Sequence, residues 1–232
     1  MGSVVDFYAT PHGRMVARLL GERLTRLWPS LAGMDLLGVG YPTPYMTDWS
    51  WRTRRSIALV PPLLPAVRWP ADRPNHVCAA SEEALPFPDL SFDRILVVHA
   101  LENAESARKL LRELWRVLRD DGRLLLVVPN RRGMWAHVEN TPFGQGQPYS
   151  SGQITRLLAT SLFRVERREA ALFVPPLTWN PLVESAGLWE ALSRAVLPPW
   201  VAGLTLAEAV KDIYAAVPVA PPQRRRVLAE AS

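Results

Sequence analysis

Two nearly continuous apolar runs constrain the fold of this chain more than any other feature of its sequence. They span residues 92–98 and 123–128, and an amphipathic helical pattern at 105–118 separates them. A run without polar alternation predicts a strand buried on both faces, as in a parallel sheet. Strand, helix and strand in this order predict a right-handed crossover. The predicted fold class is therefore α/β, with ligands expected at the carboxyl ends of the strands.

Proline pairs divide the rest of the chain into further predicted elements. Apolar residues at helical spacing predict a helix over 10–28, which Pro29 ends. Gly122 is expected to cap the helix at 105–118. Residues 204–217 fit either a strand or a helix. The other predictions are strands at 34–37, 56–60, 75–80 and 165–174, a helix from Ser150 or Ser151 to Ser161, and a helix at 182–196.

The length predicts one domain over residues 1–220, with an N-terminal helix within 1–30 and substrate or lid insertions at 130–200. Residues 221–232 are expected to be a disordered tail. The single cysteine, Cys78, excludes an internal disulfide and favours a reducing, cytoplasmic compartment. No secretory signal or membrane-spanning run is found. The histidines and Cys78 lack metal-ligand spacing, so no metal is expected.

The formal net charge of +5 comes mostly from dispersed arginines. Dispersion favours a solvated surface, and nucleic-acid binding is the weaker alternative. Arg131 and Arg132 would suit an anionic acceptor or partner, or are simply solvated. Trp49 and Trp51 fit either core packing or a partner patch. A protein partner or a homo-oligomer therefore stays open.

One segment carries a specific resemblance. It reads Glu83-Ala-Leu-Pro-Phe-Pro-Asp-Leu-Ser-Phe-Asp93, then an apolar strand, then His99-Ala-Leu-Glu-Asn103, and later Trp115-Arg-Val-Leu-Arg-Asp-Asp-Gly122. This segment resembles the class I S-adenosylmethionine (SAM) methyltransferases of type 11, the ubiquinone/menaquinone-biosynthesis kind. The resemblance implies a Rossmann-like, mostly parallel seven-stranded sheet with helices on both faces. It also implies SAM as cofactor and a small-molecule methyl acceptor.

The resemblance also assigns expected roles to residues of this chain. The turn containing Gly38 and Gly40 would pass the methionine part of SAM, an acid before Leu85 would meet the adenine, and the loop from His99 would line the sulfonium. His137 and His99 are the candidate catalytic bases. The predicted cofactor contacts are Gly38, Gly40, Tyr41, Ser81, Glu82, His99 and Leu101.

Three departures from the family pattern bear on the cofactor. Leu36 stands where the first motif has an acid, Pro42 replaces its third glycine, and no carboxylate follows the strand at 56–60. Losing a charge-assisted contact to the ribose costs about 2–3 kcal/mol. Two functions are therefore open: a SAM-dependent methyltransferase, or a methyltransferase-like binding protein with lost or weakened SAM binding. The first requires room and polar partners beside Gly38 and Gly40.

Overall fold

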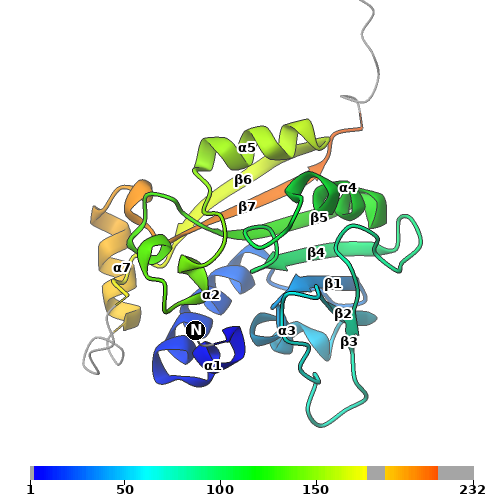
Figure 1. The fold of residues 1–232 in the computed structure, drawn as a ribbon, viewed down its shortest axis with the longest axis horizontal. Helices are drawn as coiled ribbons and strands as arrows, with labels where there is room; N and C mark the ends of the chain where they lie inside the picture. The colour runs from blue at the N-terminus through cyan, green and yellow to red at the C-terminus, as the bar shows by residue number, and fades with distance from the viewer. Residues whose placement is uncertain (1–2, 177–185, 214–232) are drawn as a thin grey trace, which may run out of the picture.

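The computed structural model describes residues 3–176 and 186–213, which form a seven-stranded sheet flanked by helices (Figure 1). The strands lie in the order β3-β2-β1-β4-β5-β7-β6. β1 to β5 pair in parallel, whereas β7 runs antiparallel to both β5 and β6. The predicted α/β fold is confirmed. The strands are β1 (Asp35–Gly40), β2 (Arg55–Val60), β3 (Val77–Ala79), β4 (Phe92–Val98), β5 (Leu118–Pro129), β6 (Phe163–Ala171) and β7 (Leu204–Lys211).

Helices cover both faces of the sheet. The core on one face includes residues of α1, α2, α3 and α7, and the core on the other face includes residues of α4 and α5. None of the described helices is long and apolar enough to cross a membrane. The helices are α1 (Val4–Ala9), α2 (Pro11–Leu27), α3 (Thr43–Ser50), α4 (Ala107–Val117), α5 (Ser151–Thr160) and α7 (Ala186–Val196), with short 3-10 turns η1 (Met134–His137), η2 (Pro142–Gly144) and η3 (Pro199–Val201).

The strand β4 shows why residues 95–98 are all apolar. Ile95 and Val97 belong to the core beneath α4, whereas Leu96 and Val98 belong to the core beneath α2. Successive side chains of a strand point to opposite faces, so a strand covered on both faces needs apolar residues at every position. The predicted strand at 92–98 is confirmed with the same bounds.

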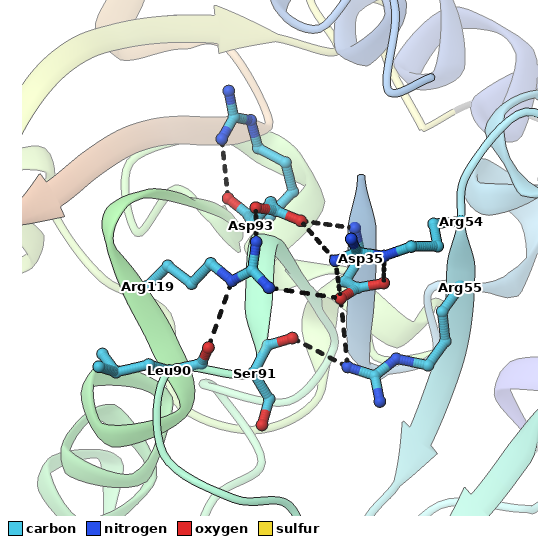
Figure 2. Close-up of polar contacts among 8 residues, drawn as sticks. Asp35, Arg54, Arg55, Leu90, Ser91, Asp93 and Arg119 are labelled. Atoms are coloured by element: carbon cyan, nitrogen blue, oxygen red, sulfur yellow. Dashed lines mark hydrogen bonds and ion pairs between the residues drawn. The ribbon is translucent and has the colours of Figure 1, made fainter. Parts of the chain in front are cut away.

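Ion pairs join the amino ends of the central strands, far along β1 from Gly40. Figure 2 shows Asp35 of β1 between Arg54, Arg55 and Arg119, with Asp93 of β4 beside them. Arg54 Nε lies 2.9 Å from Asp35 Oδ1, and the Asp35 amide donates to Asp93 at 2.7 Å. The hydrogen bond from Arg54 lowers the pKa of Asp35, and nearby Arg55 adds to this. Asp35 therefore links β1 to its neighbours through ion pairs and hydrogen bonds. It lies at the opposite end of β1 from the predicted cofactor turn.

The prediction that Gly122 caps the helix of residues 105–118 is wrong. α4 ends at Val117 with Leu118 as its cap, and β5 begins directly at Leu118. Leu118 pairs with Phe92 of β4 and Arg123 pairs with Arg94, so residues 119–122 lie in β5 at an irregularity between two paired positions. Gly122 is thus a strand residue.

Two helices were not predicted, and one ambiguous segment is now assigned. α1 precedes α2, and α3 follows Pro42 directly. Residues 204–211 form a strand, while residues 214–217 lie outside the described part, as do 182–185 of the predicted 182–196 helix. The predicted strands at 75–80 and 165–174 are observed at 77–79 and 163–171. The predicted tail at 221–232 also lies outside the described residues.

Candidate functional site

The predicted cofactor turn lies where the carboxyl ends of β1 and β4 meet. The Tyr41 amide donates to the Val98 carbonyl at 2.8 Å. Gly40 has a φ of +95°, and a Cβ there would lie 2.0 Å from that same carbonyl oxygen. Only glycine satisfies both conditions. The close approach of the two strands therefore explains Gly40.

Helix α3 packs directly against Gly38. A Cβ on Gly38 would lie 2.3 Å from the sulfur of Met46 and 2.5 Å from Cγ of Pro42. Met46 is fully buried, so this contact belongs to the core. The space beside Gly38 is therefore filled by side chains of the chain itself.

Aromatic rings occupy the neighbouring volume at the carboxyl end of the sheet. Tyr8 of α1 stacks on Tyr41 with ring centroids 5.5 Å apart and meets Tyr45 of α3 edge-on at 6.0 Å. All three tyrosines are at most 9% exposed. Phe143 of η2 lies 4.7 Å from the ring of His99. The N-terminal helix thus closes this end of the sheet.

A chain of hydrogen bonds runs through the aromatic cluster. Glu102 Oε1 lies 3.2 Å from Nδ1 of His99, whose Nε2 lies 2.9 Å from the hydroxyl of Tyr8. The Tyr8 hydroxyl in turn lies 2.6 Å from that of Tyr45. Asn103 donates to the His99 carbonyl at 2.9 Å and holds the turn after β4. Three separate segments therefore build one buried polar chain.

Burial determines the pKa values of the tyrosines in this chain of hydrogen bonds. Burial raises the pKa of the Tyr8 phenol well above its usual value, and Tyr45 adds to the effect. Burial raises the pKa of Tyr45 as well. Glu102 Oε2 is buried without a hydrogen-bond partner among the described residues. An imidazole held between a carboxylate and a hydroxyl can accept a proton on one nitrogen while the carboxylate orients the other.

The segment after β3 carries the predicted adenine contacts. Ser81 is exposed, whereas Glu82 is only 6% exposed, and its carboxylate forms no hydrogen bond or ion pair with any described residue. The next residue, Glu83, pairs with Lys109 at 2.8 Å. Leu101, another predicted contact, is 1% exposed within the core beneath α4. Of the predicted contacts in this segment, Glu82 is the buried acid whose carboxylate has no partner among the described residues.

The two candidate bases occupy different surroundings. His99 is 1% exposed and belongs to the polar chain. His137 ends the 3-10 turn η1, is exposed, and is not among the residues that line the cavity beside His99. The structure therefore places His99, and not His137, at the carboxyl ends of β1 and β4.

Tyr8, Tyr45 and Glu102 are members of the polar chain that sequence reasoning did not select. A local signal for α1 was present, because Ser3 and Asp6 form a capping box. Glu102 stood within the quoted motif after His99. Nothing local in the sequence, however, indicates that Tyr8 and Tyr45 meet, since 37 residues separate them.

A cavity of about 170 Å³ remains at this edge of the sheet. Val4, Leu64, His99, Asn103 and Gln145 are among its lining residues, and none of the described residues that line it is acidic. Pockets that hold cofactors measure about 300–1,000 Å³. The described arrangement therefore does not fit an adenosyl group: the tyrosines fill part of the volume, and the described residues that line the cavity include no acid.

Comparisons with known proteins find similarity to methyltransferases in the central segment of the chain. Residues 36–126 match the family model described as a methyltransferase domain. A ubiquinone/menaquinone biosynthesis C-methyltransferase, UbiE, of Hahella chejuensis is 50% identical over 48 residues, which are 21% of this chain and 19% of that protein. UbiE of Pasteurella multocida is 46% identical over 53 residues, 23% of this chain and 19% of that protein. The match thus spans about a fifth of these relatives.

Solved structures share the fold over most of the chain. A SAM-dependent methyltransferase of Thermotoga maritima covers 89% of this chain and 94% of its own, with a TM-score of 0.60 and 15% identity. A putative methyltransferase of Haloferax volcanii, solved with a methyltransferase activator, covers 86% and 93% with a TM-score of 0.62 and 15% identity. The [4+2]-cyclase SpnF covers 84% and 81% with a TM-score of 0.55 and 16% identity. The chain therefore has the class I methyltransferase fold.

Proposed function

We propose that this chain, a member of the SAM-dependent methyltransferase family by its central segment and its fold, transfers a methyl group to a small-molecule acceptor. The family and the fold imply SAM, which supplies both the methyl group and its own leaving group. The described arrangement is closed, so the proposal requires α1 to withdraw Tyr8 from the carboxyl ends of β1 and β4.

The observation that carries the proposal is the buried chain from Glu102 through His99 to Tyr8. Burying a carboxylate and an imidazole is costly unless they are paired, and one oxygen of Glu102 has no partner among the described residues. With Tyr8 withdrawn, Nε2 of His99 faces the opened space and can take a proton from an acceptor. Glu102 holds the ring in place.

Glu82 supports the same proposal from the β3 side. Glu82 stands before Leu85, at the sequence position for which the resemblance implies an adenine contact, and no described residue hydrogen-bonds its carboxylate. A carboxylate left with free acceptor oxygens suits the amino group of a purine.

A second function is favoured by the closed arrangement itself: a methyltransferase-like binding protein that no longer takes SAM. Tyr8 and Tyr41 occupy the space beside the glycine turn, and the lining of the remaining cavity carries no acid. Folds can be retained after their chemistry is lost. SpnF, which carries the name of a cyclase, has a similar fold.

Calorimetry with SAM and with S-adenosylhomocysteine separates the two functions. We expect dissociation constants of about 30–150 μM, because a missing ribose carboxylate weakens a micromolar site by about 2–3 kcal/mol. Glu82→Gln should weaken binding further, and its neighbour Glu83→Gln, a control with the same change of charge, should not. Absence of heat and of thermal stabilisation at about 10 mM ligand, in the wild type and in Tyr8→Ala, would establish the binding-protein alternative.

A further inference from the structure

A larger cavity lies on the α5 face of the sheet, away from the glycine turn. Its volume is about 570 Å³, within the range of pockets that hold small molecules. The first turn of α5 forms one wall, and Arg168 of β6, Thr205 of β7 and Trp200 of η3 form others. Thr205 pairs directly with Ala170 and with Val128, which belongs to the core beneath α5. The strand residues of this wall therefore share the face that α5 covers.

Two guanidinium groups at this cavity have no carboxylate partner. The Arg132 side chain forms no hydrogen bond or ion pair with any described residue, and Arg168 contacts only the hydroxyls of Ser151 and Thr155, at 3.3 and 3.2 Å. The neighbouring acid, Glu169, does not neutralise them, because its carboxylate already forms an ion pair with Arg23. The charge left at the cavity is therefore positive.

The amino end of α5 adds to this positive field. The helix has ten residues, and Ser150 caps it by accepting from the Gln153 amide at 3.2 Å. Ser151 and Gly152 of the first turn line the cavity. Free amides of a first helical turn, together with the helix dipole, favour an anion.

An unpartnered hydroxyl and an exposed ring complete the cavity. Thr205 is 8% exposed, yet its hydroxyl forms no hydrogen bond with any described residue. Thr205 lines the cavity, so its hydroxyl is free to hydrogen-bond a ligand atom there. Trp200, which is 58% exposed, presents a flat apolar surface beside it.

We propose that this cavity binds a small molecule that carries a phosphate group next to a flat ring. The phosphate lies between Arg132, Arg168 and the first turn of α5, where two guanidinium groups and the helix terminus match its double charge. Thr205 donates its hydroxyl to the same group, and the ring lies on Trp200. This inference does not depend on SAM binding or on methyl transfer.

Titration with phenyl phosphate, followed by calorimetry on the full-length chain, tests the site. We expect millimolar or tighter binding that weakens as salt is raised, weaker binding of inorganic phosphate, and none of phenol. Arg132→Gln, Arg168→Gln and Thr205→Val should each weaken phenyl phosphate binding about 10-fold or more. Trp200→Ala should weaken phenyl phosphate but leave inorganic phosphate unchanged.

Arg131→Gln is the matched control, because Arg131 is an exposed neighbour of Arg132 that does not line the cavity. Its binding should equal that of the wild type. A thermal melt of each variant separates lost binding from lost folding, and Thr205→Val is nearly isosteric. Equal loss in Arg131→Gln and Arg132→Gln, or no binding by the folded wild type at about 10 mM phenyl phosphate, would overturn the proposal.

Discussion

Gly40 and Gly21 differ in how the methyl group of an alanine at their position would change the stability of the fold. Gly40 has a left-handed backbone and a carbonyl oxygen 2.0 Å from the position of a Cβ, whereas Gly21 in α2 has nothing within 4 Å. We expect Gly40→Ala to destabilise the fold by about 3 kcal/mol or more, because strain and a backbone clash add. Gly21→Ala should stabilise it by up to about 1 kcal/mol. Urea denaturation of both variants measures the difference, and equal effects would refute this explanation of Gly40.

Tyr8 is the residue on which the closed arrangement depends. Tyr8→Phe keeps the ring but leaves His99 and Tyr45 without their shared partner, so it should cost about 1–3 kcal/mol of unfolding free energy. Tyr8→Ala opens space and should tighten SAM binding about 10-fold, because less free energy is spent on opening. Tyr8→Phe, which still fills the volume, should not tighten it. Calorimetry on the three proteins tests this, and weaker binding in Tyr8→Ala would contradict the lid role of α1.

At the level of single residues, part of the candidate site could be predicted from the sequence. His99 was selected by the motif that contains it, and Glu82 as an acid just before that motif; His99 directly follows β4, and Glu82 lies in the segment after β3. Tyr8 was beyond reach, because its role comes from contacts across 37 and 91 residues of chain. The choice of His137 followed residue type alone, which does not say where a loop turns.

Helices and strands were predictable where the pattern of burial alone determines which residues are apolar. β4 is covered on both faces and showed itself as an apolar run, and the amphipathic α4 showed itself by its period. α3 was not predicted from a sequence that contains Pro42 and Pro44, although proline is compatible with the first turn of a helix. Gly122 was misplaced because residues 119–121 resemble a turn, whereas pairing of Leu118 and Arg123 with β4 on either side of them keeps them within β5.

The amino ends of β1, β2 and β4 are joined by a pH-sensitive contact. The folded pKa of Asp35 is lowered chiefly by its hydrogen bond from Arg54, so its stabilisation is full above the ordinary carboxyl pKa of about 3.9 and is lost as the pH falls through the lowered value. Asp35→Asn should cost about 1–2 kcal/mol at pH 7, because the carboxylate is buried while Arg54 is half exposed.

Urea denaturation of Asp35→Asn and the wild type at a series of pH values checks this contact. The difference in unfolding free energy should shrink steadily as the pH falls below about 4 and through the lowered pKa of Asp35. Asp48→Asn, at an exposed position of α3, is the control and should match the wild type throughout. A difference that does not depend on pH would show that Asp35 acts through packing and not through its charge.

At the scale of the whole molecule, the fold could be predicted from the sequence, whereas the closed arrangement of the site could not. The sheet order and the match over residues 36–126 give the methyltransferase fold, and the sequence predicted it because a parallel sheet leaves a strong apolar pattern. The state of the cleft depends on how α1, α3 and η2 close over β1 and β4, which no local pattern encodes.

A crystal structure of the wild-type chain grown with S-adenosylhomocysteine tests the central claim most directly. We expect the hydroxyl of Tyr8 to have left His99, α1 to have shifted, and the adenine amino group to lie within hydrogen-bond distance of Glu82. A structure at saturating ligand that retains the contacts from Glu102 to Tyr45, with no nucleoside between β1 and β4, would contradict SAM-dependent catalysis and leave only the fold.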